Sequence, residues 1–180
     1  MSGTPEPPRW FARIDRAAGA ATAALNVLGT LLIVALAVLV NADVIGRNAF
    51  GAPVSGVPEM VSLSIVAIVF LQVAEAARQG RFIRADALPM VLATRAPRAG
   101  AALEALWHLL ALGLIVVLGL ASWPPLVQAW ERQTFVGAVG DFIAPVWPVR
   151  TIIVIGCAAL AAQFALGLVR ALLRLTGPAR

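Results

Sequence analysis

Long apolar segments without any charged residue constrain this chain more than any other feature of its sequence. The first of these segments runs from Ala17 to Ala42. At about 1.5 Å per helical residue, it is long enough to cross a hydrocarbon core of roughly 30 Å. A cleaved signal peptide has a shorter apolar region, of about 7 to 15 residues. We therefore interpret this segment as a membrane-spanning helix that the chain retains.

Three more segments of this kind follow, and we expect them to span the membrane at about residues 58–78, 105–123 and 147–169. The third is expected to end before Pro124 and Pro125, because the residue that precedes a proline disfavours the helical conformation. Hydrophobic residues make up 61% of the chain and charged residues only 13%, against roughly a quarter charged in soluble domains. The sequence therefore predicts an all-α integral membrane protein with four transmembrane helices, in one membrane domain that covers residues 1–180.

The stretch between the second and third spans, at about residues 79–103, mixes apolar side chains with several arginines and two prolines. It carries too much charge to lie in the hydrocarbon, and its mixed character is typical of short amphipathic helices in the head-group plane. We expect its arginines to contact anionic lipid head groups. These residues are Arg81, Arg84, Arg95 and Arg98.

The distribution of arginines predicts the orientation of the chain, because positively charged loops stay in the cytoplasm. Arginines on one side of the four spans are Arg9, Arg13, Arg16, Arg78, Arg81, Arg84, Arg95, Arg98, Arg170, Arg174 and Arg180. Arginines on the other side are Arg47, Arg132 and Arg150. Eleven against three predicts that both termini are cytoplasmic, and an even number of spans independently requires the termini to share a side.

A pathway for a charged solute usually needs ionisable groups near the middle of the bilayer, and the predicted spans have none there. Glu59 and Glu75 lie roughly 24 Å apart along one helix, so they cannot form a joint site. Gln72, Glu75 and Gln79 share one arc of that helix. This polar arc has two interpretations: a contact surface for a partner protein, in which Arg78 would take part, or side chains that cap the helix and reach toward the head groups.

Asp43 and Arg47 follow the first span with the spacing of neighbours on one helical face, so a helical last turn would let them pair. At a hydrated interface such a pair contributes less than about 1 kcal/mol. We expect a structural role for both residues and no contact with a solute.

Other classes of function find little support in the sequence. Single copies of cysteine and histidine, Cys157 and His108, are too few ligands for a zinc or bis-histidine haem site, and we expect Cys157 to be a packed core residue. No nucleotide-binding loop or catalytic triad is present, so we expect neither an enzyme nor a cofactor. Nucleic acid is not an expected partner, because the arginines alternate with apolar segments instead of forming one basic surface.

Two alternatives remain. One is a stand-alone small exporter with four helices, although such proteins need a carboxylate well inside the bilayer, usually beside aromatic residues, and this chain has no tyrosine. The other is a membrane enzyme whose active site the sequence does not reveal.

The segment DVIGRNAFGAPVSGVPEMVSLSIVAIVFLQVAEAARQGRFIRADAL resembles a known family over residues 43–88. An aspartate and an arginine end the first span, and a turn with glycine and proline leads to Glu59. An Ala-Ala-Arg stretch at residues 76–78 and an Ile-x-x-Asp-x-Leu motif at residues 83–88 follow the second span. The segment is similar to the small membrane subunit of tripartite ATP-independent periplasmic (TRAP) transporters. Phe82 stands where many members have histidine, so no role of that histidine is carried over.

This resemblance implies a complex in the bacterial inner membrane. Its expected partners are a larger membrane subunit, which moves the substrate, and a periplasmic substrate-binding protein. The implied activity is sodium-coupled uptake of organic anions, typically carboxylates or sialic acids, with the small subunit as a scaffold. The candidate residues for structural or interface roles are Asp43, Arg47, Glu59, Gln72, Glu75 and Arg78.

Overall fold

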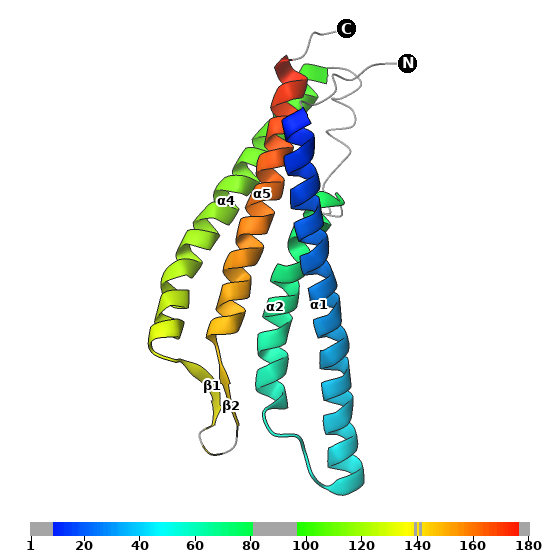
Figure 1. Ribbon diagram of the computed structural model, residues 1–180, viewed down its shortest axis with the longest axis vertical. Helices are drawn as coiled ribbons and strands as arrows, with labels where there is room; N and C mark the ends of the chain where they lie inside the picture. Colours follow the sequence, from blue (N-terminus) through cyan, green and yellow to red (C-terminus); the bar gives the residue numbers. More distant parts are fainter. Residues whose placement is uncertain (1–8, 81–96, 139, 141, 177–180) are drawn as a thin grey trace.

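The computed structural model describes residues 9–80, 97–138, 140 and 142–176 (Figure 1). These residues form the helices α1 (Arg9–Phe50), α2 (Val57–Arg78), α4 (Pro97–Glu131) and α5 (Trp147–Thr176), and the antiparallel strands β1 (Phe135–Ala138) and β2 (Phe142–Pro145). The four helices are each long and apolar enough to cross a membrane. The predicted fold of four transmembrane helices is therefore confirmed.

The helices pack in the order α1, α2, α5, α4, so that α2 and α5 are central (Figure 1). Within the chain, 33% of the most apolar window of α5 and 22% of that of α2 are buried, against 6% each for α1 and α4. Both termini lie at one end of the molecule, and the α1–α2 loop and the two strands lie at the other. The outer helices therefore present broad apolar surfaces that the described residues of this chain do not cover.

The core lies where α2, α5 and α4 meet. Its buried residues are Ala74, Ile115, Cys157 and Leu160, so the prediction of Cys157 as a packed core residue is confirmed. Gly156 permits the close contact of α5 with α2, because a Cβ atom there would lie 2.4 Å from the carbonyl oxygen of Phe70. Small residues at contacts between helices let their backbones approach in this way.

The helices extend beyond the predicted spans. The 42 residues of α1 correspond to about 63 Å at 1.5 Å per residue, roughly twice the hydrocarbon thickness. Helix α4 starts at Pro97, so the last residues of the predicted interfacial segment are its first turns instead of a separate helix. Arg98 is exposed there. Residues 81–96 of that segment, with Arg81, Arg84 and Arg95, lie outside the described residues.

The expectation that the third helix ends before Pro124 was wrong. Helix α4 contains Pro124 and Pro125 and continues to Glu131. Each proline removes one backbone donor, which leaves the carbonyl groups of Leu120 and Ala121 without their usual helical partner. Prolines are tolerated in membrane helices because neighbouring groups and local adjustments satisfy such carbonyl groups.

A β-hairpin, which the sequence did not reveal, connects α4 and α5. Phe135 pairs with Pro145 and Ala138 with Phe142. Gly56, at the start of α2, packs so closely on the Phe142 ring that a Cβ atom would lie 2.1 Å from it. The hairpin therefore links the α4–α5 pair to the α1–α2 pair at the end of the molecule opposite the termini.

Candidate functional site

The Glu75 carboxylate fastens α2 to α1. It is 4% exposed, and its Oε2 atom accepts hydrogen bonds from Thr22 Oγ1 at 2.6 Å and from Arg78 Nε at 2.8 Å. Its Oε1 atom accepts from Arg78 Nη2 and from Gln79 Nε2, both at 2.7 Å. A buried carboxylate is costly unless such donors surround it. Four donors, one of them on α1, therefore make Glu75 a link between the two helices.

Glycines on α1 create the room for this contact. Gly19 lies beside the Arg78 guanidinium, and a Cβ atom at Gly29 would be 2.7 Å from Gln72 Cγ. Gln72 and Glu75 therefore both face α1 of the same chain. The sequence grouped these two residues correctly on one arc but did not identify what covers them.

Thr22 is 1% exposed and was missed from the sequence. The single proton of its hydroxyl has a second acceptor nearby, the carbonyl oxygen of Gly19 at 3.1 Å. Threonines in helices commonly make this contact with their own backbone. The available signal was a polar residue within the alanine-rich start of the first span. That signal does not reveal a partner 53 residues away.

Asp43 fastens the other end of α1 to the loop that follows it. Its Oδ2 atom accepts from Arg47 Nη2 at 2.7 Å, and its Oδ1 atom accepts from the backbone N–H of Val54 at 2.9 Å. The predicted pairing of Asp43 with Arg47 is thus present. The carboxylate is largely buried, whereas the Arg47 side chain is 60% exposed. The loop is also held by a hydrogen bond from Ala52 N to the Gly46 carbonyl oxygen.

Glu59 lies apart from these two links. It is half-buried in the first turn of α2, next to Pro58. Glu75 lies in the last turn of the same helix, so the structure places the two glutamates at opposite ends of α2. An acidic side chain in a first turn interacts favourably with the helix dipole, which gives Glu59 a local role.

Two ion pairs that the sequence did not reveal join the end of α5 to its neighbours. Arg170 pairs with Asp15 on α1, and its guanidinium also lies 5.7 Å from the centroid of the Phe11 ring. Arg174 pairs with Glu104 on α4 at 2.9 Å. In the sequence, both arginines contributed only to the predicted orientation. Spacing along a chain does not identify partners on other helices.

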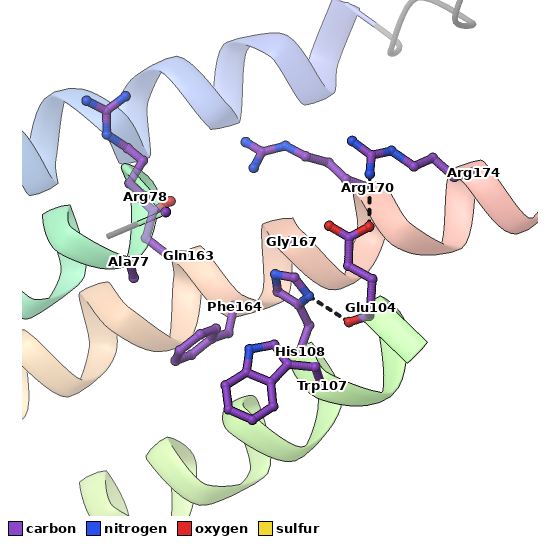
Figure 2. A pocket seen from close by; sticks show the side chains of 11 residues that line it. Ala77, Arg78, Glu104, Trp107, His108, Gln163, Phe164, Gly167, Arg170 and Arg174 are labelled. Atoms are coloured by element: carbon purple, nitrogen blue, oxygen red, sulfur yellow. Dashed lines mark hydrogen bonds and ion pairs between the residues drawn. The ribbon is translucent and has the colours of Figure 1, made fainter. Parts of the chain in front are cut away.

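A cavity of about 170 Å³ lies near these ion pairs, between the ends of α2, α4 and α5 (Figure 2). His108 lies on its wall, with Nδ1 donating to the Glu104 carbonyl oxygen at 2.8 Å. Within the described ranges, no group of three or more histidine, cysteine, aspartate or glutamate residues could hold a metal ion. The side chains found here bind one another and join helices, and they include no activated nucleophile.

Four apolar helices, with ion pairs that join α5 to α1 and to α4, define a multi-pass membrane protein. A comparison with protein families identifies the kind: the model of the DctQ component of tripartite ATP-independent periplasmic transporters matches residues 36–174. The match covers most of the chain, so the chain belongs to this family. No curated protein and no solved structure gives a significant match.

This result confirms the resemblance seen in the sequence. The family is a transporter component and not an enzyme family. The chain is therefore the small membrane subunit of a TRAP transporter, and membership implies that it works with the other TRAP components.

Proposed function

We propose that this subunit is a scaffold for the large membrane subunit of its transporter, and that it does not itself bind the substrate. In this proposal the complex takes up organic anions, such as carboxylates or sialic acids, coupled to sodium, and a periplasmic binding protein delivers them. The chain acts as one membrane domain, residues 1–180, in a bacterial inner membrane.

The observation that carries the proposal is that the oxygen atoms of the buried carboxylates accept hydrogen bonds from this chain itself. Asp43 and Glu75 are the buried acidic residues in the described part of the chain. Each accepts hydrogen bonds from donors of this chain, near opposite ends of the long helix α1. A solute pathway would need such groups free and near the middle of the bilayer. These carboxylates are instead occupied in holding helices and a loop in place.

The outer helices support the same proposal. Large apolar side chains of α1 and α4 are exposed along much of their length, for example Leu31, Val38, Leu114 and Leu120. Such surfaces suit lipid and the apolar helices of another membrane protein. A rigid layer of helices held by internal links can then widen the stationary part of a transporter while another subunit moves the substrate.

We place both termini in the cytoplasm, on the basis of the arginine distribution. Arg81, Arg84, Arg95 and Arg98 then face the anionic lipid of the inner leaflet. Asp43, Arg47, Glu59, Gln72, Glu75 and Arg78 are proposed as the residues that keep the subunit in the shape that its partner recognises.

Reconstitution tests the proposal. The purified chain alone, placed in liposomes with a proton or sodium gradient, should move no organic anion, whereas the complete transporter with its binding protein should accumulate one only with sodium. Glu75→Ala and Arg78→Ala should each lower copurification of the large subunit, with Glu131→Ala, at an exposed carboxylate that ends α4, as a control. Transport by the chain alone would contradict the scaffold function. Unchanged complex yield and uptake would remove Glu75 and Arg78 from the proposed residues.

A further inference from the structure

The cavity at the termini end of the molecule has a wall with many hydrogen-bond donors. Three arginines from two helices line it, Arg78 on α2 and Arg170 and Arg174 on α5, together with His108 and Trp107 on α4 (Figure 2). Glu104 is the acidic residue among the lining residues that the structure describes. At about 170 Å³, the cavity is about ten times larger than the minimum for one water molecule.

A buried amide on the cavity wall lacks a partner. Gln163 on α5 is 6% exposed, and its Nε2 atom is a buried side-chain nitrogen without a hydrogen-bond partner in the described part of the chain. A buried donor left in this state costs free energy. The same side chain lines the cavity, so a group that accepts hydrogen bonds there would satisfy it.

The carboxylates that pair with two of the arginines are not on the cavity wall. Glu75 binds Arg78 and Asp15 binds Arg170, but neither acid is among the lining residues. These pairs, and the one between Arg174 and Glu104, use one or two of the five N–H groups of each guanidinium. The cavity wall is therefore richer in cationic donors than in acceptors.

The helix contact between α4 and α5 is shaped to admit His108. A Cβ atom at Gly167 would lie 2.2 Å from His108 Nε2, so any larger residue there would displace the imidazole. The carbonyl oxygen of Glu104 can only accept, so Nδ1 carries the proton of that hydrogen bond. Nε2 then lies beside Gly167 on the cavity wall.

The cavity lies where the charge-free part of the helices ends. Arg170 is the first charged residue after the apolar segment of α5, and Glu104 is the last one before that of α4. This boundary is the level at which a membrane holds its phosphate groups. Guanidinium groups match the geometry of phosphate oxygens, and basic pockets between membrane helices on the cytoplasmic side bind phospholipid head groups.

We propose that this cavity binds a phosphate group, through Gln163, Arg170 and Arg174 with Arg78 and His108 beside them. The group is either the head group of an anionic phospholipid or a free phosphate ion. When bound, it joins the ends of α2, α4 and α5. The site shares Arg78 with the proposed scaffold residues, whereas Gln163, Arg170, Arg174 and His108 lie outside that set.

Native mass spectrometry of the full-length chain in detergent tests this site with three probes: phosphatidylglycerol, inorganic phosphate, and a diacylglycerol that has the same acyl chains and no phosphate. We expect retention of one phosphatidylglycerol or one phosphate per chain and no specific retention of diacylglycerol. Binding of the lipid with competition by phosphate identifies a head-group site. Binding of phosphate without the lipid identifies a soluble ion.

Gln163→Leu should lower the affinity for the bound probe about tenfold, because it removes a donor to a charged group. It should also leave the probe-free chain at least as stable, because it removes an unpartnered buried amide. Gln163→Glu keeps the side-chain size, places a repelling carboxylate in the cavity, and covers the case in which the leucine variant does not fold. Arg170→Gln should lower binding similarly.

The matched controls lie at the other end of the molecule. Gln128→Leu changes an exposed glutamine of α4, and Arg132→Gln removes an exposed arginine next to that helix; both should bind the probe like the unchanged chain. Equal retention of phosphatidylglycerol and diacylglycerol would overturn the proposal. So would undiminished binding by the Gln163 variants, equal losses in the controls, or no binding of either phosphate-containing probe.

Discussion

The two buried carboxylates of this subunit fasten α1 at two well-separated positions, Asp43 and Thr22, in different ways. Asp43 binds Arg47, four residues away, and the backbone of Val54 in the next loop. Glu75 binds Arg78 and Gln79 on its own helix but also Thr22 on α1, 53 residues away. The Asp43 link is therefore local, whereas the Glu75 link joins two helices.

This difference indicates that Asp43 stabilises a loop, whereas Glu75 stabilises the packing of α1 on α2. Loss of the local link would free a loop, but α1 and α2 would keep their apolar contact. Loss of the Glu75 link would leave the buried Thr22 hydroxyl without its acceptor and Arg78 without its counter-ion. We therefore expect the Glu75 end to dominate stability, and the predictions below test that ranking.

The largest effect is expected for Glu75→Ala. It should lower the free energy of unfolding by about 2 to 3 kcal/mol, because it strands the buried Thr22 hydroxyl and removes the buried partner of Arg78, whose own side chain is 40% exposed. The measurement is unfolding of the detergent-solubilised chain, followed by tryptophan fluorescence. Glu131→Ala, at an exposed carboxylate that ends α4, should change the free energy by no more than about 0.5 kcal/mol. Equal losses in the two variants would show that Glu75 has no special role.

Asp43→Ala should have a smaller and more local effect, of about 1 to 2 kcal/mol, because its partner Arg47 is mostly exposed and the lost backbone hydrogen bond lies in a loop. Hydrogen exchange should show faster exchange of the Val54 amide with little change in α2. Asp43→Asn keeps an oxygen that can accept from Val54, so it should protect this amide better than Asp43→Ala does. Faster exchange throughout α2 would contradict a local role.

Thr22→Val should cost about 1 kcal/mol, the usual net contribution of one hydrogen bond. The matched control is Thr30→Val, because the exposed Thr30 hydroxyl bonds only to its own helix, at the Asn26 carbonyl oxygen. That control should cost no more than about 0.5 kcal/mol. A larger loss for Thr30 than for Thr22 would be inconsistent with the link between α1 and α2.

The smallest effect is expected for Arg174→Gln. The side chains of Arg174 and Glu104 are 65% and 38% exposed, and exposed ion pairs contribute about 0 to 1 kcal/mol and are screened by salt. The loss should therefore stay below about 0.5 kcal/mol in a lipid-free sample and shrink further in high salt. A loss as large as that of Glu75→Ala would mean that this end pair also determines stability.

The sequence predicted the number and kind of spans, because lipid imposes long charge-free segments that can be read directly. It predicted the pairing of Asp43 with Arg47 for a similar reason, since helical spacing determines that contact. It did not predict helix ends, because charged residues such as Arg13 and Arg16 continue a helix after it leaves the hydrocarbon. The prolines of α4 led to a wrong prediction of its end. They weaken a helix locally, but neighbouring groups can satisfy the carbonyl groups that they leave without a partner.

Contacts between helices that are far apart in the sequence could not be predicted from it. Thr22 with Glu75 and Arg170 with Asp15 depend on the order in which the helices pack, which hydropathy does not encode. The β-hairpin was missed because its two strands are only four residues each, too short to show alternation. The candidate residues proposed for partner contact therefore remain predictions, although the structure gives several of them partners within the chain.

A double-mutant cycle between Thr22 and Glu75 tests most directly the central claim that Glu75 joins α1 to α2. The unfolding free energies of Thr22→Val, Glu75→Ala and the double variant should reveal a coupling of about 1 kcal/mol, because each single change removes the same hydrogen bond. A coupling near zero would mean that the two single losses simply add. That result would contradict the link between the helices.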